Sequence, residues 1–187
     1  MTQTPSKLLT LDEFLQQPET KPASEYIDGK IIQKPMPQGE HSVIQTDLPA
    51  TVNAILRPQK IARAFTELRC TFGGRSIVPD VSVFLWDRIP RKENGGVANR
   101  FTTAPDWAIE IVSPEQSHTK LIKKLLHCLQ HGTEMGWLID PEEQTVLVFR
   151  SQHSIAAFDE PESIILVPEF ASELTLSVGE LFGWLLE

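Results

Sequence analysis

A lone glutamate inside an apolar strand is the feature that most constrains what this chain can fold into. Residues 107–112 are apolar except for Glu110, and the run is typical of a buried β-strand. Burying a carboxylate without a partner costs roughly several kcal/mol, so such a residue is usually paired with a cation or bound to a metal ion. If this strand is buried, we expect the fold to supply a cation or a metal ion as the partner of Glu110.

A second carboxylate repeats this pattern on another candidate strand. Asp80 follows Pro79 and precedes Val81 and Val83 within residues 77–86. Two acids on separate strands form a weak motif by themselves. The ordinary alternative is that both side chains point to solvent or pair with nearby arginines, Arg69 or Arg75.

The clearest helix, over residues 119–131, adds a third element. Its apolar stripe consists of Leu121, Ile122, Leu125, Leu126 and Leu129, and Gly132 is placed to end it. The helical period places four polar residues on the opposite face: Lys120, Lys124, His127 and His131. A lysine near two metal-binding carboxylates can orient water and stabilise a phosphodiester under attack. A solvated helix face is the ordinary alternative.

The remaining pattern predicts helices and strands in mixed order. Thr10 and Glu13 form a capping box for a short helix, and Asp28-Gly29 forms a hairpin turn. A helix over 40–56 contains Pro49, which should kink or break it. Further strands are expected at 62–72, 136–139 and 145–149, a loop at 88–103 and a last helix at 178–186. This order indicates an α/β arrangement around a mixed sheet.

Length and composition narrow the class of protein. The 187 residues suit one domain over 1–187. No apolar run is long enough to span a membrane, and no secretory signal is visible. The two cysteines, Cys70 and Cys128, are too few for a disulfide framework, so we expect them reduced and partly buried. A cytoplasmic location follows as the default.

The net charge of −8 argues against strong non-specific binding to nucleic acid. It does not exclude a nuclease, because divalent ions neutralise an acidic metal site in use. The string His127-Cys128-x-x-His131 could suggest zinc, but it lacks two further ligands at plausible spacing.

Several segments together resemble one known family. They are Pro79-Asp80, residues 104–114 with Glu110 and Ser113-Pro114, the helix residues Lys124 and Gly132, residues 137–141 and the opening 25–30. In this order and spacing they resemble the Uma-two family of endonucleases, in the PD-(D/E)XK restriction-endonuclease-like superfamily. The similarity covers roughly residues 9–181. It implies an α/β (α+β) fold with a restriction-endonuclease-like core, a mixed central β-sheet flanked by helices.

The resemblance also implies roles for individual residues. Asp80 would bind a divalent ion, Mg²⁺ or Mn²⁺, and Glu110 would be its second ligand, with the backbone carbonyl of Ile111 completing the shell. The superfamily places a lysine two residues after this acid, where this chain has Val112. As in similar family members, the lysine role passes to the helix, which makes Lys124 the candidate.

Two upstream residues complete the implied site. Glu25 resembles the additional acid that many of these nucleases use near the metal. His41 is a weaker candidate, because a histidine at a helix N-terminus is more often a surface residue than a ligand. If the site forms, Asp80 and Glu110 should lie within reach of one ion. The clustered acids should also repel one another, so at least one of them should have a raised pKa in the absence of metal.

The implied activity is metal-dependent hydrolysis of DNA phosphodiester bonds by activated water. DNA is the expected partner, and a homodimer is plausible because cleavage of a duplex needs two active sites. The alternative is a non-catalytic member that binds nucleic acid or protein and only keeps the fold. Cleavage of RNA or of another phosphate ester also stays open.

Overall fold

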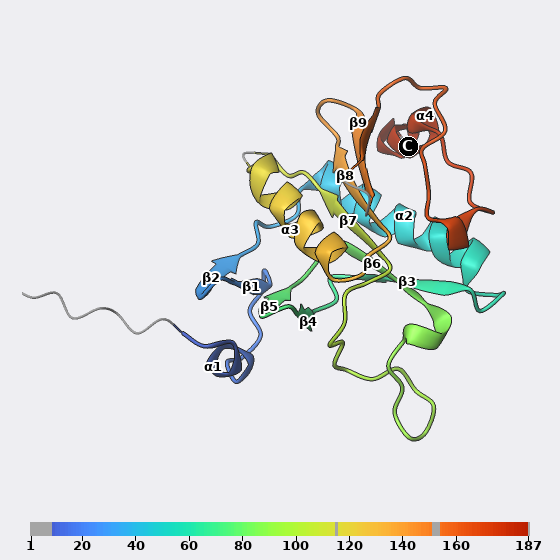
Figure 1. Ribbon diagram of the computed structural model, residues 1–187. Coiled ribbons are helices and arrows are strands. Elements are labelled where there is room, and N and C mark those ends of the chain that lie inside the picture. Colours follow the sequence, from blue (N-terminus) through green and yellow to red (C-terminus); the bar gives the residue numbers. More distant parts are fainter. Residues whose placement is uncertain (1–8, 115, 151–153, 187) are drawn as a thin grey trace, which may run out of the picture.

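The computed structural model describes residues 9–114, 116–150 and 154–186 (Figure 1). The helices are α1 (Leu11–Leu15), α2 (Gly39–Leu56), α3 (His118–Gln130) and α4 (Val178–Gly183), with short 3₁₀ turns at Trp86–Arg88, Glu169–Ala171 and Trp184–Leu186. The strands are β1 (Ser24–Ile27), β2 (Lys30–Gln33), β3 (Ala62–Thr66), β4 (Cys70–Phe72), β5 (Arg75–Ile77), β6 (Val81–Leu85), β7 (Trp107–Ile111), β8 (Met135–Asp140), β9 (Thr145–Arg150) and β10 (Ile155–Phe158).

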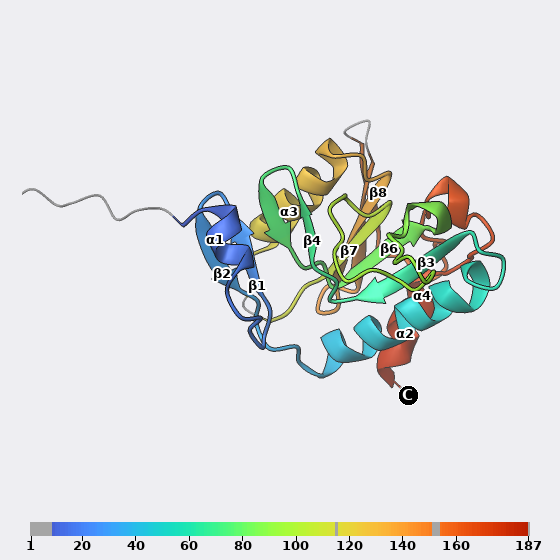
Figure 2. The same cartoon turned by 90° about the horizontal axis from the view of Figure 1, so that it is seen from below.

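The larger sheet has the strand order β10-β9-β8-β7-β6-β3. Its neighbours are antiparallel except β7 and β8, which are parallel and are connected through α3. Figure 2 shows this sheet between α3 on one side and α2 with α4 on the other. The mixed sheet flanked by helices is therefore confirmed.

The alternation of side chains along β7 decides which residues face α3. Trp107, Ile109 and Ile111 belong to the apolar core that includes residues of α2 and α4. Ala108 belongs to the second core, which includes residues of α3. Because successive side chains of a strand point to opposite faces, Glu110 shares the α3 side with Ala108. The strand thus presents its lone carboxylate to α3.

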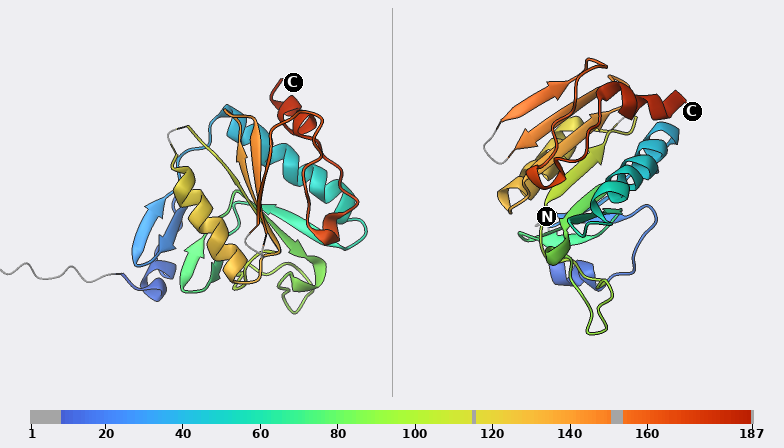
Figure 3. Two further views of the ribbon diagram at one scale, coloured as in Figure 1. Left: turned by 45° about the horizontal axis from the view of Figure 1, so that its top comes forward. Right: turned by 90° about the vertical axis from the view of Figure 1, so that its right-hand side faces the viewer.

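The smaller sheet has the strand order β2-β1-β5-β4 and lies beside α3 (Figure 3, left). The predicted Asp28-Gly29 turn joins β1 and β2, with both residues at positive φ. Gly73, in the β4–β5 turn, has a φ of +55°, and a Cβ there would lie 2.2 Å from Nε2 of His131. Only glycine fits this turn, so the second hairpin packs closely against the end of α3.

Two predicted strands each divide between the sheets. Residues 62–72 form β3 in the larger sheet and β4 in the smaller one, and the chain bends at Glu67, whose φ is +47°. Residues 77–86 contain the end of β5 and all of β6, with Asp80 immediately before β6. Strand β10 at the edge of the larger sheet was not predicted. A single periodic run cannot show where a chain changes from one sheet to another.

The predicted break at Pro49 is wrong, because α2 continues through this residue. Pro49 is buried, and Ile44, Leu48 and Val52 on the same helix are fully buried in the core. Packing of this face outweighs the lost backbone hydrogen bond, because most helical stability in proteins comes from tertiary contacts. The predicted capping box of Thr10 and Glu13 is confirmed at α1.

The expected burial of the cysteines and the expected lack of a membrane-spanning helix can both be compared with the structure. Both cysteines are free, and both thiols are fully buried. None of the helices in residues 9–114, 116–150 and 154–186 combines the length and apolar character that crossing a membrane requires.

Candidate active site

Asp80 and Glu110 face one another at the junction of β6 and β7. The register pairs Val81 with Ile109 in antiparallel strands, which places Asp80 opposite Glu110 on the same face. Their exposed fractions are 2% and 1%. The alternative of solvent exposure or pairing with the arginines is wrong. Both arginines pair elsewhere: Arg69 with Glu19, and Arg75 with Asp28.

Asp80 has a hydrogen-bond donor or a cation at each of its oxygens. Its Oδ1 lies 2.7 Å from Nζ of Lys34. Its Oδ2 accepts a hydrogen bond of 2.8 Å from the backbone N–H of Ile111 and lies 3.2 Å from Nε2 of His41. Burial alone would raise the pKa of Asp80, but Lys34 and His41 outweigh burial and hold the pKa well below its usual range. Asp80 is therefore an ionised and fixed carboxylate.

Glu110 has far less support. Its Oε2 lies 2.9 Å from Nζ of Lys124, but this ion pair lacks hydrogen-bond geometry. Neither oxygen of Glu110 has a hydrogen-bond partner among the residues that the structure describes. Burial raises the pKa of Glu110 to about 8, and the charge of Asp80 adds to this while Lys124 opposes it. The expectation that one acid of the cluster has a raised pKa is confirmed.

Lys124 extends from α3 into the cluster and contacts two acids. Its Nζ lies 2.9 Å from Oε1 of Glu25 and 2.9 Å from Oε2 of Glu110. Burial would lower the pKa of Lys124, but the two carboxylates raise it above its usual range. Lys124 is buried whereas its neighbour Lys123 is exposed.

Glu25 brings the smaller sheet into the site. It lies on β1 and is 5% exposed. Its Oε1 accepts a hydrogen bond of 2.7 Å from the backbone N–H of Val78, in addition to its contact with Lys124. Glu25 thus ties α3 to the chain segment that leads into Asp80.

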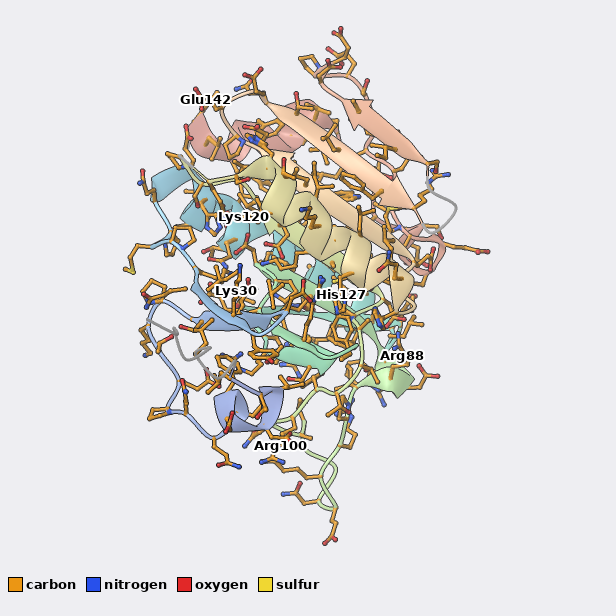
Figure 4. All side chains as sticks on the ribbon, turned by 60° about the vertical axis from the view of Figure 1, so that its left-hand side comes forward. Lys30, Arg88, Arg100, Lys120, His127 and Glu142 are labelled. Atoms are coloured by element: carbon orange, nitrogen blue, oxygen red, sulfur yellow. The ribbon has the colours of Figure 1, made fainter. Side chains whose placement is uncertain are left out.

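The predicted polar face of α3 is only partly right. Lys124 shares the buried side of the helix with Leu121 and Leu125, while Leu126 is 38% exposed. Lys120 is exposed near the start of α3, and His127 lies farther along the helix beside the smaller sheet (Figure 4). Helix α3 contacts both sheets, so it buries residues beyond its leucine stripe. A prediction from one apolar stripe cannot show the second contact.

His127 has a packing role away from the acids. Its ring stacks on Phe72 with centroids 5.0 Å apart, and its Nε2 lies 3.2 Å from the carbonyl oxygen of Phe72. Burial lowers the pKa of His127 to about 4, so the ring is neutral at physiological pH.

Sequence reasoning missed Lys34 and misplaced His41. Lys34 follows β2, and a lysine at the end of a mostly exposed strand gives no local signal of burial. His41 lies in the first turn of α2, where a surface position was expected, but it is buried at 6% exposure beside Asp80. Only the approach of β2 and α2 to Asp80 shows that both belong to the site.

The donor set can be compared with what a metal ion needs. Within the described residues, no group of three or more His, Cys, Asp or Glu side chains is placed to hold an ion, and this includes the candidate zinc string. Glu110 nevertheless offers two buried oxygens without hydrogen bonds, next to the ionised Asp80. Carboxylate oxygens suit hard cations such as Mg²⁺ and Mn²⁺. The residues present therefore fit a divalent ion at this pair of acids.

The chain is similar to known proteins of one family. Residues 11–179 match the family Uma2, described as "Putative restriction endonuclease". A crystal structure described as "a putative nuclease belonging to DUF820", from Anabaena variabilis, is 65% identical, and the alignment covers 95% of this chain and 99% of that one with a TM-score of 0.93. A DrdV–DNA complex has 11% identity over 74% of this chain and 10% of that one, with a TM-score of only 0.38. No curated protein matches the chain. The chain therefore belongs to the Uma2 family, and its fold is restriction-endonuclease-like.

Proposed function

We propose that this protein is a metal-dependent endonuclease that hydrolyses DNA phosphodiester bonds with Mg²⁺ or Mn²⁺. Asp80 and Glu110 hold the ion, and the backbone carbonyl of Ile111 and the carboxylate of Glu25 are further candidate ligands. The observation that carries the proposal is the Glu110 carboxylate, which is buried without a hydrogen bond among the described residues.

The excess of negative over positive groups in the buried cluster supports the binding of a further cation. Three carboxylates, those of Glu25, Asp80 and Glu110, lie against two ammonium groups, those of Lys34 and Lys124. Without a further positive charge Glu110 takes up a proton, which its pKa of about 8 expresses. A divalent ion bound here would supply the positive charge, activate water and neutralise charge on the phosphodiester.

The protein's own residues hold the reacting groups in place. The N–H of Ile111, together with Lys34 and His41, fixes the orientation of Asp80. Lys124 places an ammonium group beside Glu110, where it can orient water and stabilise negative charge on the phosphate. Glu25 holds this ammonium in position from the other side.

DNA has to reach a site that is closed in this conformation, because Asp80 and Glu110 are almost completely buried. A surface cavity of about 570 Å³ borders the cluster at Glu67 and Val78, and both of these residues contact Lys34. Two basic residues, Lys21 and Arg69, line this cavity together with two acids, Glu19 and Glu67. We place the approach of the DNA backbone here, with movement of the covering segments on binding.

Incubation with plasmid DNA and Mn²⁺ tests the proposal. The wild type should nick or linearise the plasmid, and Asp80→Ala should not. Asp87→Ala is the matched control, because Asp87 is an exposed acid just after β6. Equal cleavage by the wild type and Asp80→Ala would contradict the proposal, and cleavage of single-stranded RNA alone would assign another substrate.

A second candidate is a non-catalytic member that binds nucleic acid or protein. The net charge of −8 favours its protein-binding form, because this charge opposes non-specific binding to DNA. A folded wild type that shifts DNA in a gel but leaves it intact with Mn²⁺ would support this candidate. We further propose that the protein acts in the cytoplasm as a homodimer, each subunit cutting one strand. Light scattering on the purified protein, with and without duplex DNA, measures the oligomeric state.

A further inference from the structure

Lys34 lies in a cage of oxygen atoms next to the two proposed metal ligands. Its Nζ lies 2.7 Å from Oδ1 of Asp80, 3.0 Å from the carbonyl oxygen of Val78 and 3.2 Å from Oε1 of Glu67. An ammonium group has three N–H donors, so these contacts use all of them. The side chain is 8% exposed.

This cage has the chemistry of a divalent cation site. Two carboxylates and one backbone carbonyl are the oxygen ligands that Mg²⁺, Mn²⁺ and Ca²⁺ take in proteins. The ligands come from two places in the chain: Glu67 at the bend after β3, and Val78 and Asp80 in the short segment between β5 and β6. The fold brings them together around one positive charge, and that charge belongs to a side chain.

Asp80 is common to this cage and to the proposed metal pair. In two-metal phosphodiesterases the ions lie about 3.5–4 Å apart, so neighbouring ligand sets often share a carboxylate. Here Asp80 contacts the ammonium of Lys34 and also lies opposite Glu110.

We propose that the Lys34 ammonium takes the place of a second divalent cation, so that the site works with one metal ion. This inference rests on the proposed function, because the first ion is the one held by Asp80 and Glu110. Lys34 acts as a positioning residue for Asp80 and as a fixed positive charge beside the phosphate site.

The cavity next to Lys34 makes the inference testable. Glu67 and Val78 line both the cage and the surface cavity of about 570 Å³. A short side chain at position 34 would leave three oxygens facing a space that water and ions can enter. A side chain of similar length without charge would keep that space filled.

Calorimetric titration of the purified chain with Mn²⁺ at neutral pH, in the absence of DNA, measures the number of bound ions. We expect about one ion per chain for the wild type, about two for Lys34→Ala and about one for Lys34→Met. Lys30→Ala is the matched control, because Lys30 is an exposed lysine on the neighbouring strand β2, and it should bind as the wild type does (Figure 4). Adding Glu67→Gln to Lys34→Ala should weaken the second ion at least about tenfold, because it removes one charged ligand.

The outcomes separate this inference from the proposed function. About one ion in the wild type and also in Lys34→Ala would overturn the inference alone. No binding by the wild type would contradict the metal site of the proposed function and this inference with it. If Lys34→Ala is unfolded in chelator, Mn²⁺ should restore its folded circular dichroism spectrum, and a variant that stays unfolded in Mn²⁺ counts against the inference.

Discussion

Asp80 and Glu110 are equally buried and lie opposite one another, yet their surroundings differ. Asp80 is contacted by an ammonium group, an imidazole and a backbone N–H. Glu110 has one ion pair without hydrogen-bond geometry. The pKa of Asp80 is accordingly held below its usual range, and that of Glu110 is raised to about 8.

The difference shows that burial does not decide the charge of an acid in this site. Burial raises the pKa of both carboxyl groups. The positive charges and hydrogen-bond donors near each group decide whether this effect is overcome. Lys34 and His41, together with the charge of Lys124, overcome the effect of burial at Asp80. Glu110 has fewer positive partners, so its carboxylate binds a proton or, as we propose, a metal ion.

Removing the lysine on the Glu110 side should have the largest effect. Lys124→Ala should lower plasmid cleavage by about 10²–10³-fold, because a fixed charge at the reacting phosphate is lost. Lys123→Ala on the exposed side of α3 should cleave at the wild-type rate. Circular dichroism checks that both variants fold. Near-normal cleavage by Lys124→Ala would transfer the role to another residue, with Lys120 as the next to test.

Removing the ion pairs of Asp80 should instead lower the free energy of unfolding. Asp80→Asn removes the charge that Lys34 and His41 face, and breaking a buried ion pair costs about 3–5 kcal/mol. Urea denaturation in chelator measures the free energy of unfolding. Asp87→Asn, an exposed neighbour, should change it by less than about 0.5 kcal/mol. A loss at Asp80 as small as at Asp87 would remove the contrast between the two carboxylates.

Binding of Mn²⁺ should stabilise the folded protein mainly through Glu110. Mn²⁺ at a hundredfold excess over its Kd should stabilise the wild type by about 2.7 kcal/mol and raise its Tm. Glu110→Gln should gain little, because a charged ligand is missing. Differential scanning calorimetry with and without Mn²⁺ compares the two proteins. Equal shifts would place the ion at other residues.

The pH dependence of stability should be set by Glu110 in the absence of metal. Its pKa in the folded protein is about 8 against an ordinary value of 4.5. A raised acid pKa means that the folded state binds more protons, so its contribution is present below about pH 4.5 and is lost as the pH rises through 8. Glu110→Gln should flatten this decline.

The gain in stability from Glu110→Gln above pH 8 should be modest, about 1 kcal/mol, because a buried amide without partners has its own cost. Urea denaturation in chelator across this pH range measures it. A decline of the same size in both proteins would assign the titration to another group.

The sequence allowed most of the fold and part of the site to be predicted. Glu110 and Asp80 stood out because each interrupts an apolar strand, and Lys124 was added by resemblance to the family. Lys34 and His41 could not be found in this way. Each reaches Asp80 from a different part of the chain, and neither has a local pattern that distinguishes it from a surface residue.

The errors in the fold have the same origin. Pro49 was expected to kink or break a helix on local grounds, but α2 is continuous through this residue, and its buried face packs in the core. The division of residues 62–72 between two sheets depends on which strands lie alongside, and periodicity carries no information about that. Local chemistry predicted the elements, and tertiary packing decided their boundaries and partners.

Proton release on metal binding tests the central claim most directly. Burial raises the pKa of Glu110 and favours its protonated form without metal, so we expect an ion that binds there to displace a proton. Titration of the wild type with Mn²⁺, in two buffers of different ionisation enthalpy, should show release of about one proton per chain, and Glu110→Gln should release none. A wild-type binding enthalpy that is the same in both buffers, or equal release by Glu110→Gln, would contradict the account.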